Sequence, residues 1–551
     1  MKKLAALLLS VMLLAGTAAA DVVFNEPGTF PMANEVVTLK IFAPQDGEFS
    51  RADNLQTKEL EEKLGIKIEW VIGASGSIRD KLNLMLAGND EDMVDLIFVG
   101  VGDRLDRVTE AQLGAQGLIL PLNEYYDTIS VGYKDAFAKL PGFREAITTP
   151  DGNIYSMPNV DGSLHIQYMM KLWINTAWLD NLNLAMPTTT EEFYQVLKAF
   201  KEQDANGNGD PNDEIPLSTI KDTLSAQIDG FLMAPFQVTS EGDRLYVDNG
   251  VVSFSPVQEG YREGLRYLNK LYAEGLLNPE SFTQDLANQV NVNENGDEAK
   301  IGCFLGMRPG FSCDLSTMPN SKKWEQYQSL DPLAGPDGEA IAAWNPYTMY
   351  QTGMVFIPAA AKNPEAAFRL VDYLATLDGS LRSAYGVEGV HWRYATEGEV
   401  GLDGTPSYVT MLPAAKEDTN YAWTQLAGLV RDTRFTAWAT TNPDPYAEDV
   451  RPLDGRQVVL YQGSLGHEAV RQPLESVLPP LYFTEDVAEE IALKKVNVMD
   501  YTKEALVRFI TGDLSLDEDW DSYVQTLNDI GLEDYLALYQ GAYDMSAFAA
   551  K

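Results

Sequence analysis

Short β-branched runs alternate with capped helical segments in the N-terminal third of the chain. The expected strands cover residues 36–42, 66–71 and 94–99, and the expected helices cover residues 55–64 and 78–87. Both helices end at a glycine, Gly65 and Gly88. This alternation predicts a parallel sheet covered by helices on both faces, so the fold class is α/β.

Ligands of open α/β sheets bind beyond the carboxyl ends of the strands. The three expected strand ends here are glycine-rich and polar, and Asp46 follows the first of them. Polar loops of this kind are also common where nothing binds. The sequence contains no phosphate loop. The dinucleotide fingerprint is incomplete, because Gly100 and Gly102 are not followed by its third glycine. We therefore keep Asp46 as a candidate ligand-binding residue without a nucleotide.

Residues 204–216 read Asp-Ala-Asn-Gly-Asn-Gly-Asp-Pro-Asn-Asp-Glu-Ile-Pro. Oxygen-bearing side chains occupy alternate positions, and Gly209 stands at the sixth place, where a calcium loop turns sharply. Ile215 replaces the usual closing Glu at position twelve. Carboxylates and amides without His or Cys suit Ca²⁺ better than zinc or copper. A polar surface turn is the alternative, since these residues dominate turns anyway. The predicted calcium ligands are Asp204, Asn206, Asn208, Asp210, Asp213 and Glu214.

The flanking segments indicate a structural role for this metal. Thr189 and Glu192 have the spacing of a capping box, and an apolar stripe follows them in helical register. After the loop, Pro216 biases Ile215 toward extended chain, whereas an EF-hand needs a second helix there. We therefore expect calcium to hold together a helix-to-strand turn.

An export signal is expected at the start of the chain. Lys2 and Lys3 precede the apolar run 4–15, and three alanines at 18–20 offer a cleavage site, so residues 1–20 are a predicted signal peptide. Thr17 stands where a lipoprotein signal requires Cys. No other stretch is long enough to span a membrane. We expect a soluble periplasmic, extracellular or cell-surface protein without a lipid anchor.

Composition limits the partners and the chemistry. The 551 residues imply more than one lobe, and the net charge of −40 disfavours nucleic acid while favouring a soluble monomer. Three histidines leave little for His-based catalysis. Cys303 and Cys313, the two cysteines, are either a disulfide or two buried thiols, because their spacing does not fix the Cα separation that a bridge requires.

Aromatic residues are numerous, and some lie in polar, loop-like contexts. Flat rings with amide and carboxylate neighbours suit sugar rings, which present apolar faces edged by hydroxyl groups. Trp344, Trp392 and Trp423 are the candidate sugar platforms on this ground. The alternative for any single Trp is that it fills the core.

Several motifs together resemble family 1 extracellular solute-binding proteins of bacterial ABC sugar importers, in particular the LipO-like and alginate-oligosaccharide-binding branch. Besides the calcium loop and the helix before it, they are Gly-Leu-Ile-Leu-Pro-Leu at 117–122, Leu-Trp-Ile-Asn-Thr-Ala-Trp-Leu at 172–179, Asn-Pro-Glu-Ala-Ala at 363–367, Tyr-Gly-Val-Glu-Gly-Val-His-Trp at 385–392, Phe-Ile-Thr-Gly-Asp at 509–513 and Trp-Asp-Ser-Tyr at 520–523. The resemblance covers nearly the whole mature chain.

This resemblance implies a periplasmic-binding-protein type II fold: two α/β lobes with a cleft and a hinge, plus C-terminal helices. Lobe 1 is expected at 21–162, lobe 2 with the calcium loop at 163–340, a return segment and hinge at 341–400, and the completion of lobe 2 at 401–551. By the same resemblance, Glu388 and Trp392 contact sugar, as do Tyr155 and Asp161 near the first crossing. The calcium loop carries over to residues 204–214.

The predicted function is capture of an oligosaccharide between two closing lobes and its delivery to a membrane permease, without catalysis. A ligand can shift such an open–closed equilibrium only through contacts that are better in the closed state. A peptide-binding importer subunit is one alternative. A calcium-stabilised secreted glycosidase or lyase is the other, which would need two carboxylates at a defined separation.

Overall fold

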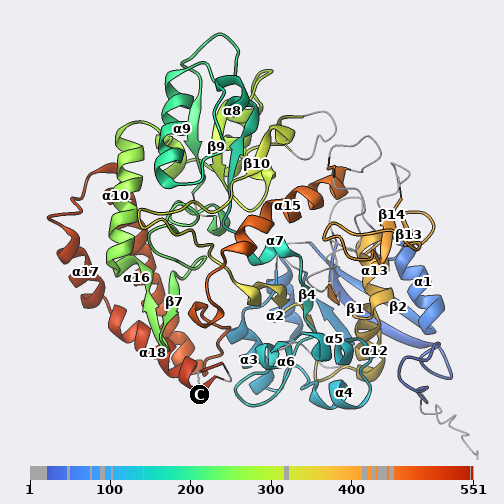
Figure 1. The fold of residues 1–551 in the computed structure, drawn as a ribbon. Coiled ribbons are helices and arrows are strands. Elements are labelled where there is room, and N and C mark those ends of the chain that lie inside the picture. Colours follow the sequence, from blue (N-terminus) through green and yellow to red (C-terminus); the bar gives the residue numbers. More distant parts are fainter. Residues whose placement is uncertain are drawn as a thin grey trace, which may run out of the picture.

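The computed structural model (Figure 1) is a mixed α/β protein with two large hydrophobic cores, one in each of two lobes. The first core uses side chains between Met32 and Val160 and between Met349 and Ala375, together with Trp423. The second uses side chains between Leu172 and Leu333 and from the C-terminal helices. The structure describes residues 22–45, 50–74, 77–86, 88, 93–100, 103–140, 142–221, 223–314, 322–412, 420–423, 430–431, 444–445, 452–546 and 548–549.

The first lobe is built on a four-stranded sheet of order β12-β3-β1-β2. Its strands are β1 (Val37–Pro44), β2 (Ile66–Gly73), β3 (Leu96–Phe98) and β12 (Val355–Phe356). The first three are parallel, with Ile41 opposite Trp70 and Leu96, and β12 runs antiparallel to β3. The helices of this lobe are α1 (Leu55–Leu64), α2 (Ile78–Leu86), α3 (Arg107–Ala115), α4 (Asn123–Thr128), α5 (Gly132–Lys139), α6 (Phe143–Ile147) and α12 (Pro364–Leu374). The predicted parallel sheet is confirmed.

The bounds of α1 follow from its caps. The side chain of Asn54 accepts a hydrogen bond from the backbone N–H of Gln56, which satisfies one free donor of the first turn. Gly65 ends the helix at φ 69°, a left-handed conformation that glycine adopts without strain. The chain therefore turns at Gly65 and enters β2 directly.

The second lobe has a four-stranded sheet of order β10-β5-β9-β6. Its strands are β5 (Leu172–Asn175), β6 (Ile215–Ser218), β9 (Ile301–Leu305) and β10 (Tyr327–Ser329). A separate hairpin of β7 (Leu245–Asp248) and β8 (Val251–Phe254) packs against the C-terminal helix α18 (Leu532–Met545). The helices are α8 (Thr176–Leu182), α9 (Thr190–Glu202), α10 (Glu259–Ala273), α11 (Leu286–Glu294), α16 (Glu485–Thr511), α17 (Trp520–Asp529) and α18 (Leu532–Met545). The last three are the expected C-terminal helices, and α10 packs against α16 (Figure 1).

Short elements at the junction join the lobes. A three-stranded sheet of order β11-β4-β15 combines β4 (Asn159–Asp161), β11 (Tyr350–Gln351) and β15 (Val430–Arg431). Around it lie α7 (Leu164–Gln167), the 3₁₀ turn η7 (Pro346–Met349) and α15 (Pro452–Ala469), which is drawn between the two lobes in Figure 1. The chain passes between the lobes on leaving β4, on entering β11 and after β15.

The described residues between 401 and 431 lie with the first lobe, whereas the sequence led us to expect 401–551 in the second lobe. The hairpin of β13 (Trp392–Tyr394) and β14 (Val409–Met411) packs on α13 (Leu377–Tyr385), Trp423 enters the first core, and β15 pairs with β4. Trp423 anchors this part of the chain, because its ring packs against Trp70 of β2 and its Nε1 donates to Thr57 of α1.

Candidate functional site

Strand ends from both lobes lie at the junction: the amino end of β5, the carboxyl end of β9 beside it and the carboxyl end of β4. Lys171 directly precedes β5, and its carbonyl accepts a hydrogen bond of 3.0 Å from the N–H of Gly306, the residue after β9. Arg308 follows in the same turn. From the other side come Asp161 at the end of β4 and His165 on α7. Strand ends of this kind are where open α/β sheets bind ligands.

Trp344 is the predicted platform that lies at this junction. Its ring is half-buried, and its Nε1 donates to the side-chain oxygen of Gln167 on α7 at 3.1 Å. The guanidinium of Arg471, just after α15, lies over the ring at 4.7 Å from the centroid. Gln472 accepts from the backbone N–H of Trp344 at 3.3 Å. Partners on both sides therefore fix the orientation of the indole.

Asp161 is also at the junction, but its carboxylate is engaged. It forms an ion pair with Arg431 and accepts a 3.1 Å hydrogen bond from the N–H of Ser163. Burial would raise the pKa of Asp161, but Arg431 and the hydrogen bonds from Ser163 leave it below the ordinary value. The charged carboxylate therefore holds β4 to β15.

His165 lies beside that pair and is 8% exposed. Burial lowers its pKa to about 4; the charge of Asp161 opposes the shift, whereas those of Lys171, Arg431 and Arg456 add to it. The imidazole is therefore neutral at pH 7. Its surroundings are dominated by positive charge.

Trp392 and Glu388 lie elsewhere in the first lobe. Trp392 is 1% exposed, packs with Leu381 and Val409, and donates from Nε1 to the carbonyl of Gly386 at 2.8 Å. Glu388 is exposed at the rim of a hollow of about 230 Å³ beside α1 and α13. Trp392 lines the same hollow from within its packed cluster, and its contact with a sugar stays a prediction.

Trp423 and Tyr155 are core residues. Trp423 is 1% exposed, packs edge-on against Trp70, and donates to the hydroxyl of Thr57 at 2.8 Å. Tyr155 is 4% exposed and covers Gly114, where a Cβ would come within 2.4 Å of its ring. Neither ring is available as a platform, because tertiary packing covers it. Asp46 lies outside the described residues.

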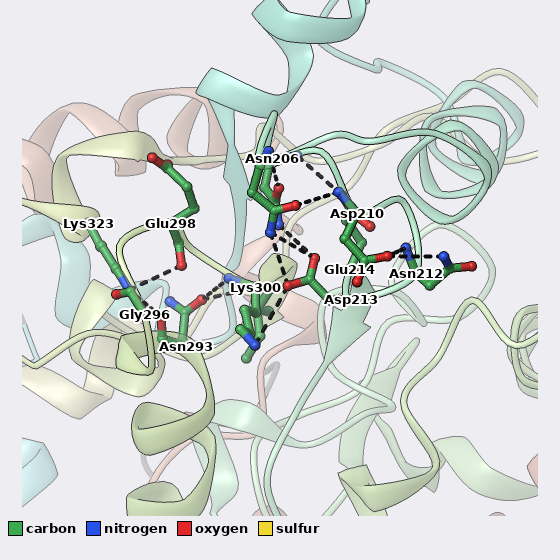
Figure 2. A network of polar contacts seen from close by, with 12 residues as sticks. Asn206, Asp210, Asn212, Asp213, Glu214, Asn293, Gly296, Glu298, Lys300 and Lys323 are labelled. Atoms are coloured by element: carbon green, nitrogen blue, oxygen red, sulfur yellow. Dashed lines mark hydrogen bonds and ion pairs between the residues drawn. The ribbon is translucent and has the colours of Figure 1, made fainter.

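The loop 204–214 runs from the end of α9 to the start of β6, as predicted, and Figure 2 shows polar contacts within it. Asp204 accepts from the N–H of Gly209 at 2.9 Å, as expected where the loop turns at the sixth place. The side-chain amides of Asn206 and Asn208 donate to Asp213 at 3.0 and 3.1 Å. Lys300, which directly precedes β9, lies 3.6 Å from the other oxygen of Asp213.

Two buried oxygens of this loop have no hydrogen-bond partner: Oδ1 of Asp204 and Oε2 of Glu214. Burial raises the pKa of Glu214 although backbone N–H groups donate to it. Buried carboxylate oxygens without a partner are costly, so a bound cation would suit these residues. Among the described residues, no three His, Cys, Asp or Glu side chains are already gathered as metal ligands. The donor set of carboxylates and amides fits Ca²⁺.

The structure has two free thiols at Cys303 and Cys313, both buried, and no bridge between them. Burial raises the pKa of both thiols, and the amide of Asn293 donates to the sulfur of Cys313 at 3.7 Å. The sequence left open a disulfide or two buried thiols, and the structure has two buried thiols.

Comparison with known proteins places the chain in a family. Residues 43–379 match the bacterial extracellular solute-binding proteins. The chain belongs to this family. It is 28% identical over 528 residues to the fructooligosaccharide ABC transporter substrate-binding protein FusA of Streptococcus pneumoniae, covering 94% of this chain and 91% of FusA. It is 26% identical to lipoprotein LipO of Bacillus subtilis across 68% of this chain and 69% of LipO.

Solved structures agree with this family membership. FusA in complex with kestose superposes with a TM-score of 0.68 at 25% identity, covering 92% of this chain and 99% of FusA; an EF-hand mutant of FusA with fructo-nystose gives 0.67 with the same identity and coverage. An HMO-binding, ABC-transporter-associated solute-binding protein from Bifidobacterium longum infantis gives 0.74 at 21% identity, covering 94% and 99%. The expected type II solute-binding fold is confirmed. No described helix is long and apolar enough to cross a membrane.

Sequence reasoning missed the cations at the junction: Lys171, Arg308, Arg431 and Arg456. They come from segments far apart in the chain, and no local pattern marks any of them as a site residue. Only the crossing of the chain between lobes brings them together.

Proposed function

We propose that this protein is the substrate-binding subunit of an ABC importer and that it captures an oligosaccharide between its two lobes. The observation that carries the proposal is that similarity to FusA extends over 94% of the chain, through both lobes and every crossing between them. A match confined to one lobe would not support the proposal, because closure on a ligand requires both lobes. The captured sugar leaves unaltered, since the protein is proposed to bind and release without catalysis.

Ligand binding would drive closure in this proposal. A ligand shifts the open–closed equilibrium only by contacts it makes better with the closed form. The half-buried Trp344 is the proposed ring platform at the junction, and Asp161 with Arg431 supplies polar partners beside it. Glu388 is the proposed carboxylate on the first lobe. Trp392 positions the Glu388 segment, because its Nε1 holds Gly386.

We also propose that the loop 204–214 holds a structural Ca²⁺. The supporting observations are the unpartnered buried oxygens of Asp204 and Glu214 and the existence of an EF-hand mutant of FusA. The residues that would hold the ion are Asp204, Asn206, Asn208, Asp210, Asp213 and Glu214. Bound calcium would supply positive charge to these oxygens and tie the end of α9 to the start of β6.

We also propose that the protein is exported. Residues 1–20, which lie outside the described residues, would be removed as a signal peptide. The partners are an oligosaccharide and the membrane permease, and the protein acts as a monomer, consistent with its net charge of −40.

Calorimetry against a panel of oligosaccharides and peptides tests the proposed function. We expect saturable 1:1 binding of at least one oligosaccharide, and the same sugar recovered at its original length by mass spectrometry after prolonged incubation. Shortened chains would show a glycosidase or lyase. Binding of peptides but not of sugars would show a peptide-importing subunit.

A further inference from the structure

The lobes also touch through elements that do not carry the chain between them. Helix α3 of the first lobe contacts α16 of the second. Because α3 follows β3, its first turn lies at the sheet edge formed by the carboxyl ends of β1, β2 and β3. Ligands of open α/β sheets bind at this edge, so lobes that close on a ligand approach each other there.

Tyr482 reaches α3 from the second lobe. Its chain neighbours Leu481 and Phe483 pack in the second core. The guanidinium of Arg107, the first residue of α3, lies over the Tyr482 ring at 4.8 Å from the centroid. Arg107 also donates to the carbonyl of Ala146 in its own lobe at 2.5 Å. The contact therefore joins one side chain from each lobe, and the arginine is anchored on its own side.

Glu110 lies one helical turn beyond Arg107, so the two side chains share a face of α3. Glu110 is 0% exposed, and its Oε1 accepts from the hydroxyl of Ser156 at 2.6 Å. Its Oε2 has no hydrogen-bond partner in the part of the chain that the structure describes. One buried acceptor of the first lobe is therefore unused.

The hydroxyl oxygen of Tyr482 is likewise shielded from solvent and has no hydrogen-bond partner among the described residues. Burial raises the pKa of Tyr482; the charge of Arg107 opposes this shift and that of Glu110 adds to it. A donor of one lobe and an acceptor of the other are thus both buried and unused at the same contact. Such groups have lost their water without gaining a hydrogen bond, which destabilises this arrangement.

We infer that Tyr482 and Glu110 form a latch between the lobes: when the lobes close on a sugar, the hydroxyl of Tyr482 donates to Oε2 of Glu110. This inference rests on the proposed function, because it requires closure. The bond is made only in the closed form, so it raises the affinity for the sugar without touching it. Both are positioning residues.

Tyr482→Phe tests the latch, because it removes the hydroxyl and keeps the ring against Arg107. The full mature protein is titrated with fructo-, xylo-, manno- and galacturono-oligosaccharides of three to six units. We expect about three- to tenfold weaker binding of whichever chains the parent binds. The loss should lie in faster dissociation with unchanged association, because the bond forms after encounter.

The melting temperature without sugar separates the latch from a structural role. It should stay the same or rise in Tyr482→Phe, because the variant removes a buried hydroxyl that has no partner in this arrangement. Tyr535→Phe is the matched control: it also removes a buried hydroxyl without a partner in the described ranges, but inside the second core. The control should leave the affinity and the dissociation rate unchanged.

A double-mutant cycle assigns the effect to the pair. Glu110→Met removes the acceptor at similar side-chain volume, and adding Tyr482→Phe to it should weaken binding little further. Losses that multiply would show that the two groups act independently and would overturn the latch. So would equal affinity and dissociation rate in the parent and Tyr482→Phe, which leaves the proposed function standing. Binding of no sugar by the parent would overturn the proposed function itself.

Discussion

The guanidinium of Arg471 lies 4.7 Å from the centroid of the Trp344 indole, so a residue just after α15 covers a residue just before η7. Glu468 pairs with the same guanidinium at 2.6 Å and accepts from the hydroxyl of Tyr168. Cation–π contacts of this kind are worth about 0.5–2 kcal/mol, more as water is excluded. The contact therefore ties together two of the segments through which the chain passes between lobes.

Trp344→Ala should weaken oligosaccharide binding by about 1 kcal/mol or more, because an aromatic contact with the sugar is lost. Calorimetry with the ligand found in the panel measures the change. Trp423→Phe is the control: this ring is buried in the first core and donates to Thr57, so its change should lower the melting temperature and leave affinity unaltered. Unchanged affinity in Trp344→Ala would remove Trp344 from the site.

Chelation of calcium should lower the melting temperature and leave the choice of sugar unchanged. A ligand that binds only the folded form stabilises it according to its concentration and affinity, so removing calcium removes that contribution. Differential scanning calorimetry with and without EGTA measures the shift. Asp204→Ala should abolish the shift, whereas Asp248→Ala, at the exposed last residue of β7 in the same lobe, should retain it. An identical melting temperature with and without chelator would contradict the calcium site.

Lys300→Met should raise the affinity for calcium several-fold. The ammonium of Lys300 lies 3.6 Å from Asp213 Oδ2, so its positive charge opposes a second cation at the same loop. Repulsion at this range, in partly exposed surroundings, is on the order of 1 kcal/mol. Titration of metal-free protein with calcium measures it, with Lys221→Met as the control. Weaker binding in the Lys300 variant would show that the lysine supports the metal-bound loop.

Glu110 makes stability depend on pH. Its carboxyl is buried on α3 and accepts from Ser156 at 2.6 Å, and burial raises its pKa from 4.5 to about 7. Because the folded-state pKa lies above the ordinary value, the stabilising contribution is complete below pH 4.5 and is lost as pH rises toward 7.

Glu110→Gln keeps an amide in place of the neutral carboxyl and removes this dependence. Between pH 5 and pH 8, the free energy of unfolding of the parent protein should fall by about 2–3 kcal/mol relative to the variant. Urea unfolding at the two pH values measures it, and Glu124→Gln on the surface is the control. A parallel pH dependence of parent and variant would refute the assignment.

Much of the secondary structure could be predicted from local sequence features such as helix caps. Helix α1 has the expected bounds because Asn54 and Gly65 cap it, and Thr189 caps α9 through the N–H of Glu192 at 3.1 Å. The start of the second lobe was harder to predict: α7 occupies Leu164–Gln167, and β5 begins only at Leu172. The crossing between lobes forces a turn there that no residue pattern marks.

The ligand-binding site was harder to predict from sequence, because the exposure of a side chain depends on packing by segments that are far away in the chain. Trp392 and Trp423 have the same polar sequence context as Trp344, yet both are 1% exposed because other segments cover them. Likewise, Arg308 and Arg456 are almost 150 positions apart in the chain. A composition that is strongly acidic overall gave no sign of the cations that meet at the junction.

Small-angle X-ray scattering with and without a saturating oligosaccharide tests the central claim most directly. If sugar is captured between closing lobes, the radius of gyration falls on binding, and it returns to its starting value when the intact sugar is removed by dialysis. An unchanged radius of gyration at demonstrated saturation would contradict the account.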